Sequence, residues 1–212
     1  MQRYPLLIFD LDGTLIDSFP AIKLGLNRAL AEFGLAPIDL DWIHKNVGRG
    51  AKKLVGAIQS NGIPPETILS RFKQHFREVH LQNSPALPGV DETLRRLAEN
   101  HSLAIASNKP LAWIEELLDH HGWNALMAAI AGPETVDAHK PDPKMLKYIL
   151  ESTGYGAGDA LFVGDMPIDA ETGINAGISV IGVTTGAASR EDLLAAGCTE
   201  VLESITALPF ST

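Results

Sequence analysis

The sequence has very little cysteine and no long hydrophobic run. Its 212 residues include a single cysteine, Cys198, so no internal disulfide is possible, and we expect this residue to pack or lie at the surface rather than act as a nucleophile. No uninterrupted apolar run approaches the roughly 20 residues that a membrane helix needs. The first apolar run, residues 6–9, is too short for the core of a signal peptide. We therefore expect a cytoplasmic protein with no membrane partner.

Positive charge is also scarce. The chain has 17 Lys and Arg residues against 26 Asp and Glu residues, which gives a formal net charge of -9. Nucleic acid is held mainly by Lys and Arg, so we expect no nucleic-acid partner. A small anion can still bind where local backbone N–H groups, a few cations and a metal ion outweigh the distant net charge.

Short apolar runs alternate with helical patterns over most of the chain. The predicted strands are residues 6–9, 103–106, 127–130, 160–163 and 178–183. The predicted helices between them are residues 91–100, 111–121, 143–152, 170–176 and 191–196. This alternation predicts an α/β fold, with a Rossmann-like parallel sheet covered by helices on both faces.

Residues 18–84 interrupt this alternation. They carry helical spacing but no convincing strand, and the predicted helices are residues 19–33, 40–45, 51–59 and 65–81. The chain returns to the α/β pattern near residues 85–89. We therefore predict an α/β core domain of residues 1–17 and 85–212, with a helical domain of residues 18–84 inserted after the first strand.

Polar residues follow the predicted strands, and in an open parallel sheet the ligand lies beyond the carboxyl ends of the strands. These residues are Asp10, Asp12, Ser107, Asn108, Lys140, Asp165 and Asp169. Two carboxylates about 4 Å apart repel each other by about 4 kcal/mol at an effective dielectric constant near 20. Clustered aspartates therefore need a cation, and ligation by oxygen alone suits Mg²⁺.

The same residues suit phosphoryl transfer. Of Asp10 and Asp12, one carboxylate can attack phosphorus, while the other protonates the leaving oxygen and then activates water. Gly13 permits a tight turn whose exposed N–H groups can hold phosphate oxygens. Lys140 can neutralise the nucleophile and the phosphoryl group, and the Ser107 hydroxyl can donate to a phosphate oxygen.

Each feature also has an ordinary structural explanation. The first acidic motif could be a turn, Asp165 and Asp169 could cap the following helix, and Ser107 could cap another. Lys140 could be a solvated surface residue. Four such motifs in this order, each following a strand or its loop, are together more typical of a catalytic site.

Four segments resemble the motifs of the haloacid dehalogenase superfamily, in its phosphatase branch. They are residues 10–15 (DLDGTL), Ser107, residues 140–143 (KPDP) and residues 164–169 (GDMPID). The resemblance spans essentially the whole chain. It implies a Rossmann-like sheet with strand order 5-4-1-2-3, a helical cap inserted after the first motif, and Mg²⁺ as cofactor. Dehalogenases generally lack the second aspartate of the first motif, so Asp12 favours phosphoryl chemistry.

The resemblance also implies residue roles. Asp10 would be the nucleophile and Asp12 the general acid and base, while Ser107 and Lys140 would bind the phosphoryl group. The implied metal ligands are Asp10, Asp12 through its backbone carbonyl, Asp165 and Asp169, the last from the first or second coordination shell.

Within that branch the chain looks most like phosphoglycolate phosphatases. Residues 107–110 (SNKP) resemble their Thr-Asn-Lys-Pro segment, which places Asn108 at the substrate, and residues 47–51 resemble their cap loop. We expect a small phosphorylated metabolite as substrate and a monomer or homodimer. Arg49, helped by Lys52, could bind a second anionic group such as a carboxylate; both could equally be solvated cap residues.

Other functions stay open at this point. A mutase of the β-phosphoglucomutase type shares the aspartate pair and the cap class but returns the phosphate to a sugar. A phosphonate-cleaving relative would need a Schiff-base lysine in the cap, for which Lys52 and Lys53 qualify only by residue type. A non-enzymatic phospho-acceptor module lacks the helical insertion, and a relative that only binds a partner usually loses motif residues, none of which is missing here.

Overall fold

The computed structural model describes residues 4–209. The chain divides into two compact units, one formed by Met1–Ile16 and Ala86–Thr212 and the other by Asp17–Pro85. The boundaries predicted from the sequence, after residues 17 and 84, lie one residue from these.

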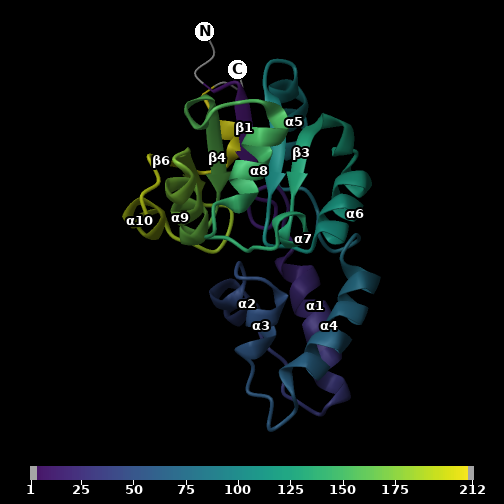
Figure 1. The fold of residues 1–212 in the computed structure, drawn as a ribbon. Coiled ribbons are helices and arrows are strands. Elements are labelled where there is room, and N and C mark those ends of the chain that lie inside the picture. The colour runs from purple at the N-terminus through teal and green to yellow at the C-terminus, as the bar shows by residue number, and fades with distance from the viewer. Residues whose placement is uncertain (1–3, 210–212) are drawn as a thin grey trace. The chain divides into compact units, whose positions relative to one another are not determined.

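The first unit is built on a six-stranded parallel sheet in the order β3-β2-β1-β4-β5-β6 (Figure 1). Its strands are β1 Leu6–Phe9, β2 Ser102–Ala106, β3 Met127–Ala131, β4 Ala160–Gly164, β5 Ser179–Val183 and β6 Glu200–Leu202. The predicted α/β class and the order of the first five strands are confirmed. The sequence prediction missed β6, because three residues with only Val201 buried give no readable alternation.

Helices cover both faces of this sheet. They are α5 Val90–Ala98, α6 Leu111–His121, α7 Pro133–Val136, α8 Lys144–Thr153, α9 Pro167–Ala176 and α10 Arg190–Ala195. On one face, α8 and α9 bury side chains such as Leu146 and Ala170 against Ile8 and Phe162 of the central strands. Helix α5 packs against β2. The four-residue helix α7 was not predicted, since one turn is too short to show periodicity.

The register of the sheet determines where the polar loops begin. Phe9 at the end of β1 lies level with Ile105 of β2 and Val163 of β4. The backbone N–H of Asp10 continues the ladder by donating to the carbonyl of Val163, with 2.9 Å between N and O. The loops that follow β1, β2 and β4 therefore start at one edge of the sheet.

The second unit is helical, with α1 Phe19–Glu32, α2 Leu40–Asn46, α3 Ala51–Gly56 and α4 Pro65–Val79. Helices α1 and α4 pack closely because Gly25 has no side chain: a Cβ there would lie 3.0 Å from the Cα of Phe76. On the exposed side, Glu32 accepts hydrogen bonds from Arg71 and contacts His75. Helix α3 ends at Gly56, three residues before the predicted end.

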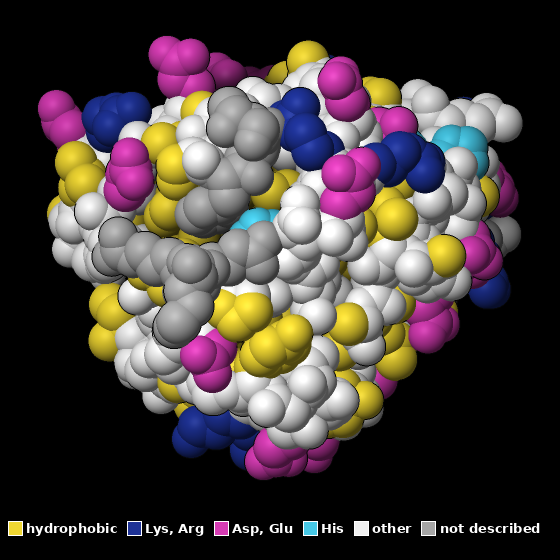
Figure 2. Space-filling model, turned by 90° about the horizontal axis from the view of Figure 1, so that it is seen from above, with side chains coloured by type: hydrophobic (Ala, Val, Ile, Leu, Met, Phe, Trp, Pro, Cys, Tyr) yellow, Lys and Arg dark blue, Asp and Glu magenta, His cyan; other side chains and the backbone are white. Residues whose placement is uncertain are grey.

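None of the helices within residues 4–209 combines the length and the apolar composition needed to cross a bilayer. Figure 2 shows one face of the molecule, on which Lys and Arg side chains lie among Asp and Glu side chains. Across the coloured part of that face, no broad area carries a single sign of charge.

Candidate active site

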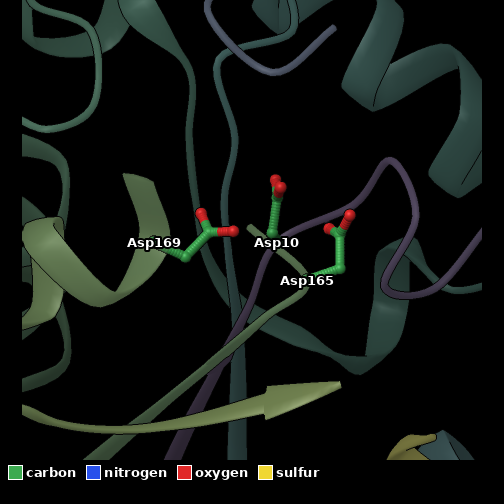
Figure 3. A group of neighbouring side chains, drawn as sticks. All are labelled: Asp10, Asp165 and Asp169. Carbon is green, nitrogen blue, oxygen red and sulfur yellow. The ribbon is translucent and has the colours of Figure 1, made fainter. Parts of the chain in front are cut away.

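Three carboxylates converge at the carboxyl ends of β1 and β4. Asp10 directly follows β1, Asp165 directly follows β4, and Asp169 lies in the first turn of α9. One oxygen from each lies within 4.8 Å of the others, and all three residues are buried. In Figure 3 the Asp10 carboxylate lies between the other two. Residues far apart in the sequence thus form one anionic cluster.

Lys140 is the cation of this cluster. Its Nζ lies 2.6 Å from Oδ1 of Asp169 and 3.0 Å from Oδ1 of Asp10, and the residue is only 2% exposed. The loop that carries it is fixed by Asn108, whose Oδ1 accepts from the Lys140 backbone N–H at 2.7 Å and whose Nδ2 donates to its carbonyl at 3.3 Å. Lys140 therefore reaches the nucleophile candidate from a backbone that is held on both sides.

Asp165 forms no ion pair with any residue between positions 4 and 209. The hydroxyl of Thr14 donates to its Oδ1 at 3.0 Å, whereas its Oδ2 is buried and has no hydrogen-bond partner among residues 4–209. Two glycines make room for this carboxylate. A Cβ at Gly186 would lie 1.7 Å from Oδ2, and one at Gly13 would lie 2.5 Å from it.

The pKa values reflect this crowding. Burial raises the pKa of Asp165 well above its usual range, and the Asp10 and Asp169 carboxylates raise it further. Burial also raises the pKa of Asp169 to about 6, although Lys140 opposes this change. Burial acts to lower the pKa of Lys140, but Asp10 and Asp169 outweigh it, so its pKa is raised and the ammonium is retained. A divalent cation would lower the pKa of both aspartates by stabilising the carboxylate form.

The carboxylate of Asp12 lies apart from this cluster and pairs with a second lysine. Nζ of Lys109 donates to both of its oxygens, at 2.7 Å and 2.8 Å. The Lys109 side chain is 4% exposed and that of Asp12 is 17% exposed. Four carboxylates therefore face two ammonium groups at this edge of the sheet.

Ser107 and Asn108 follow β2 and differ in what they contact. The Ser107 backbone N–H donates to the carbonyl of Ala131, and its hydroxyl oxygen accepts from the Lys109 N–H at 3.4 Å, so its hydroxyl hydrogen can still donate to a ligand. Asn108 was predicted to bind substrate, but its side-chain oxygen and nitrogen engage the Lys140 backbone. Its observed contact is thus structural support for the Lys140 loop.

Gly13 lies in the predicted turn, and its role toward a phosphate stays a prediction. Its φ of 82° is a conformation that glycine adopts readily, as the predicted tight turn requires. Its own N–H donates to the carbonyl of Ile16 at 2.8 Å, so any N–H that holds a phosphate oxygen would come from another residue of the turn. Its carbonyl accepts from the hydroxyl of Thr185 at 2.7 Å. Gly13 therefore joins the first motif to the loop after β5 and makes space for Asp165.

The donor set fits Mg²⁺. Three buried carboxylates within 4.8 Å of one another form an oxygen-only site of the kind that this ion prefers. Oδ1 of Asp10 and Oδ2 of Asp165 have no hydrogen-bond partner within residues 4–209, although Oδ1 of Asp10 is ion-paired with Lys140. With all groups ionised, the four aspartates and the two lysines leave two negative charges, which one divalent cation neutralises. Asp10, Asp165 and Asp169 are the side chains that could hold such an ion.

The predicted substrate residues Arg49 and Lys52 belong to the second unit. Arg49 lies in the loop between α2 and α3, and Lys52 lies in α3; both side chains are exposed. Their role toward the substrate stays a prediction.

Several residues of the site were not assigned a role from the sequence. They are Lys109, Thr14, Thr185 and Gly186. Lysine is seldom buried, so a buried lysine at position 109 is not expected from residue type alone. The available signals were its place in the loop directly after β2 and its membership of the SNKP segment at residues 107–110.

The fold and the site together define a class: a doubly wound α/β protein with an acidic site at the carboxyl ends of its central strands. The family model of the haloacid dehalogenase-like hydrolases matches residues 7–183. The chain belongs to this family, as its four motifs predicted.

Individual relatives agree with this assignment. The phosphoglycolate phosphatase of Rhodospirillum rubrum is 34% identical over 213 residues, which cover 95% of this chain and 88% of the relative. That of Psychrobacter arcticus is 31% identical and covers 96% of this chain and 93% of the relative. The crystal structure of a predicted phosphoglycolate phosphatase from Haemophilus somnus 129pt superposes with a TM-score of 0.88 at 26% identity, covering 97% of this chain and 96% of that one. The prediction of an enzyme, a phosphoric monoester hydrolase similar to phosphoglycolate phosphatases, is confirmed.

Proposed function

We propose that the chain is a Mg²⁺-dependent phosphatase that hydrolyses phosphoglycolate, or a closely related small phosphate monoester, with Asp10 as its nucleophile. The environment of Asp10 carries this proposal. Its carboxylate lies 3.0 Å from Nζ of Lys140 and within 4.8 Å of the oxygens of Asp165 and Asp169. A nucleophile with an ammonium on one side and a cation site on the other can approach an anionic phosphoryl group without prohibitive repulsion.

The proposed reaction has two steps. In the first, an oxygen of Asp10 forms a bond to phosphorus, the ester P–O bond breaks, and the proton of the Asp12 carboxyl passes to the leaving oxygen. In the second, a water oxygen bonds to phosphorus, the bond to Asp10 breaks, and Asp12 takes the proton of the water. Lys140 balances the charge on Asp10 and on the phosphoryl oxygens, while the Ser107 hydroxyl donates to one of those oxygens.

The metal site completes the arrangement. Asp10, Asp165 and Asp169 would hold Mg²⁺ through their side chains, and Asp12 through its backbone carbonyl. The bound ion would supply positive charge that draws the phosphate to Asp10 and stabilises charge on its oxygens. The unpartnered Oδ2 of Asp165 supports this assignment, because a buried carboxylate oxygen otherwise bears a desolvation cost with no compensation.

The substrate is proposed from the relatives and from the second unit. Phosphoglycolate carries a carboxylate in addition to its phosphate, and the exposed Arg49 and Lys52 are suited to bind that second anionic group. A monomeric or homodimeric state and a cytoplasmic location stay predictions, as does the absence of nucleic-acid and membrane partners.

The test is phosphate release from a panel of phosphate monoesters, in Mg²⁺ and in EDTA, by wild type and by Asp10→Asn. We expect release that needs Mg²⁺ and falls by ~10³-fold or more in the variant, since amide nitrogen is a poor nucleophile. Acid quenching followed by mass spectrometry should find a phosphate adduct on Asp10 of the wild type only. Asp41→Asn, at an exposed aspartate of α2, is the matched control and should keep full activity.

The same panel tests the substrate. Arg49→Ala should raise KM for phosphoglycolate more than for ethyl phosphate, which lacks the carboxylate. Equal KM changes for the two esters would remove Arg49 from the proposal. If no ester of the panel released phosphate and a sugar phosphate were isomerised instead, the mutase reaction would replace hydrolysis in this proposal.

A further inference from the structure

Lys109 is a buried lysine that the proposed reaction does not use. Its ammonium contacts both carboxylate oxygens of Asp12, at 2.7 Å and 2.8 Å. A lysine usually keeps its ammonium in water because desolvating a charge is costly, and here the side chain is 4% exposed. The contact with Asp12 compensates that cost and locates the ammonium at the proposed general acid.

The backbone around Lys109 is held firmly. Ser107 continues the sheet by donating its N–H to Ala131, and the N–H of Lys109 donates to the Ser107 hydroxyl oxygen. Asn108 is hydrogen-bonded to both backbone groups of Lys140. Pro110 then leads into α6. The ammonium thus comes from a short loop tied to the sheet and to the Lys140 loop, so its position is set by the core fold.

We propose that Lys109 is the positioning residue for Asp12, which it holds by both oxygens so that the proton donor stays aligned during departure of the leaving group. The inference rests on the proposed function. A carboxylate that contacts one ammonium through both oxygens cannot rotate without losing a contact. When one oxygen carries the proton, the other still accepts from Lys109, so the acid remains in place.

Charge gives Lys109 a second effect on the same step. As the ester P–O bond breaks and the leaving oxygen takes the proton, a negative charge appears on the Asp12 carboxylate. The Lys109 ammonium lies within hydrogen-bond distance of both oxygens on which this charge develops, and a charge-assisted contact is stronger than a neutral one. Lys109 thus supports Asp12, while Lys140 supports Asp10.

The test compares two esters that differ in their need for the proton. The alkoxide of phosphoglycolate leaves poorly unless it is protonated, whereas p-nitrophenolate is a stable anion and leaves unaided. For Lys109→Met we expect kcat/KM for phosphoglycolate to fall by ~10- to 10²-fold, as for partial loss of general acid catalysis. For p-nitrophenyl phosphate we expect a fall of less than about threefold. We compare kcat/KM because it reports only the steps up to and including the first irreversible one, which here is the loss of the leaving group.

Three variants make the result specific. Lys109→Arg keeps the charge and should restore most of the lost kcat/KM for phosphoglycolate. Adding Lys109→Met to Asp12→Asn should cause little further loss, because a residue that acts only through Asp12 has no effect once the carboxylate is gone. Lys147→Met, at an exposed lysine of α8, is the matched control and should leave both esters unaffected.

The inference is overturned if Lys109→Met slows both esters by the same factor, or if its effect adds fully to that of Asp12→Asn. Should Lys109→Met fail to fold, Lys109→Arg and the double variant decide the question by the same comparison. Failure of the proposed function looks different: wild type would then release no phosphate, or Asp10→Asn would remain active.

Discussion

The carboxylate cluster should lower the stability of the protein when no metal is bound. Asp165 is the clearest place to test this, because its Oδ2 has no partner in the described part of the chain and its pKa is raised well above normal. At 4.8 Å and an effective dielectric constant of about 20, two carboxylates repel each other by about 3 kcal/mol. Asp165 faces two such charges, and Lys140 offsets about one of them.

Asp165→Asn removes this charge and keeps the size of the side chain. Its amide oxygen can still accept from Thr14, as Oδ1 of the aspartate does. In EDTA, at a pH where Asp165 is ionised, we expect the free energy of unfolding to rise by about 3 kcal/mol, which is the one repulsion that Lys140 does not offset.

In Mg²⁺ this difference should largely disappear. An ion present at 100 times its Kd adds about 2.7 kcal/mol to the wild type, and the variant, which lacks one ligand, gains much less. Urea unfolding followed by circular dichroism, in EDTA and in Mg²⁺, measures both differences. Asp41→Asn controls for the loss of one surface charge. If Asp165→Asn were destabilised equally in both buffers, the carboxylates would not repel one another as argued and would not form the cation site.

Two further predictions concern the same site. A Cβ at position 186 would lie 1.7 Å from Oδ2 of Asp165, so Gly186→Ala should displace that carboxylate and lower kcat/KM by ~10-fold or more. The control is Gly158→Ala, whose Cβ meets nothing within 4 Å and which should keep full activity. Equal activity of the two variants would show that Gly186 does not make room for Asp165. In EDTA, Asp169 holds its proton more tightly in the folded state, with a pKa of about 6 against an ordinary 3.8. Its contribution to stability is therefore complete below about pH 3.8 and lost as the pH rises through about 6, and urea unfolding of wild type and Asp169→Asn across this range should show the difference.

Much of the fold was predictable because its signals are local. Leu6–Phe9 is buried on both faces of the sheet, and such a strand shows as a continuous apolar run. Helix α6 has the bounds that its apolar spacing predicted, with Gly122 ending it in the left-handed conformation. Elements of three or four residues, β6 and α7, carry too few positions to form a pattern, and both were missed.

Which carboxylates stand at strand ends can be predicted from the sequence alone, because an apolar strand followed by an aspartate is visible in a few consecutive residues. This signal located Asp10 and Asp165, while Lys140 was indicated by the KPDP motif in the loop that leads from β3 to α8. Which of these groups meet is visible only in the folded chain. Lys109 and Asp12 are 97 residues apart, and Thr185 and Gly13 are 172 residues apart. Such pairs depend on strand order and on the direction of each side chain, which packing of the whole core sets.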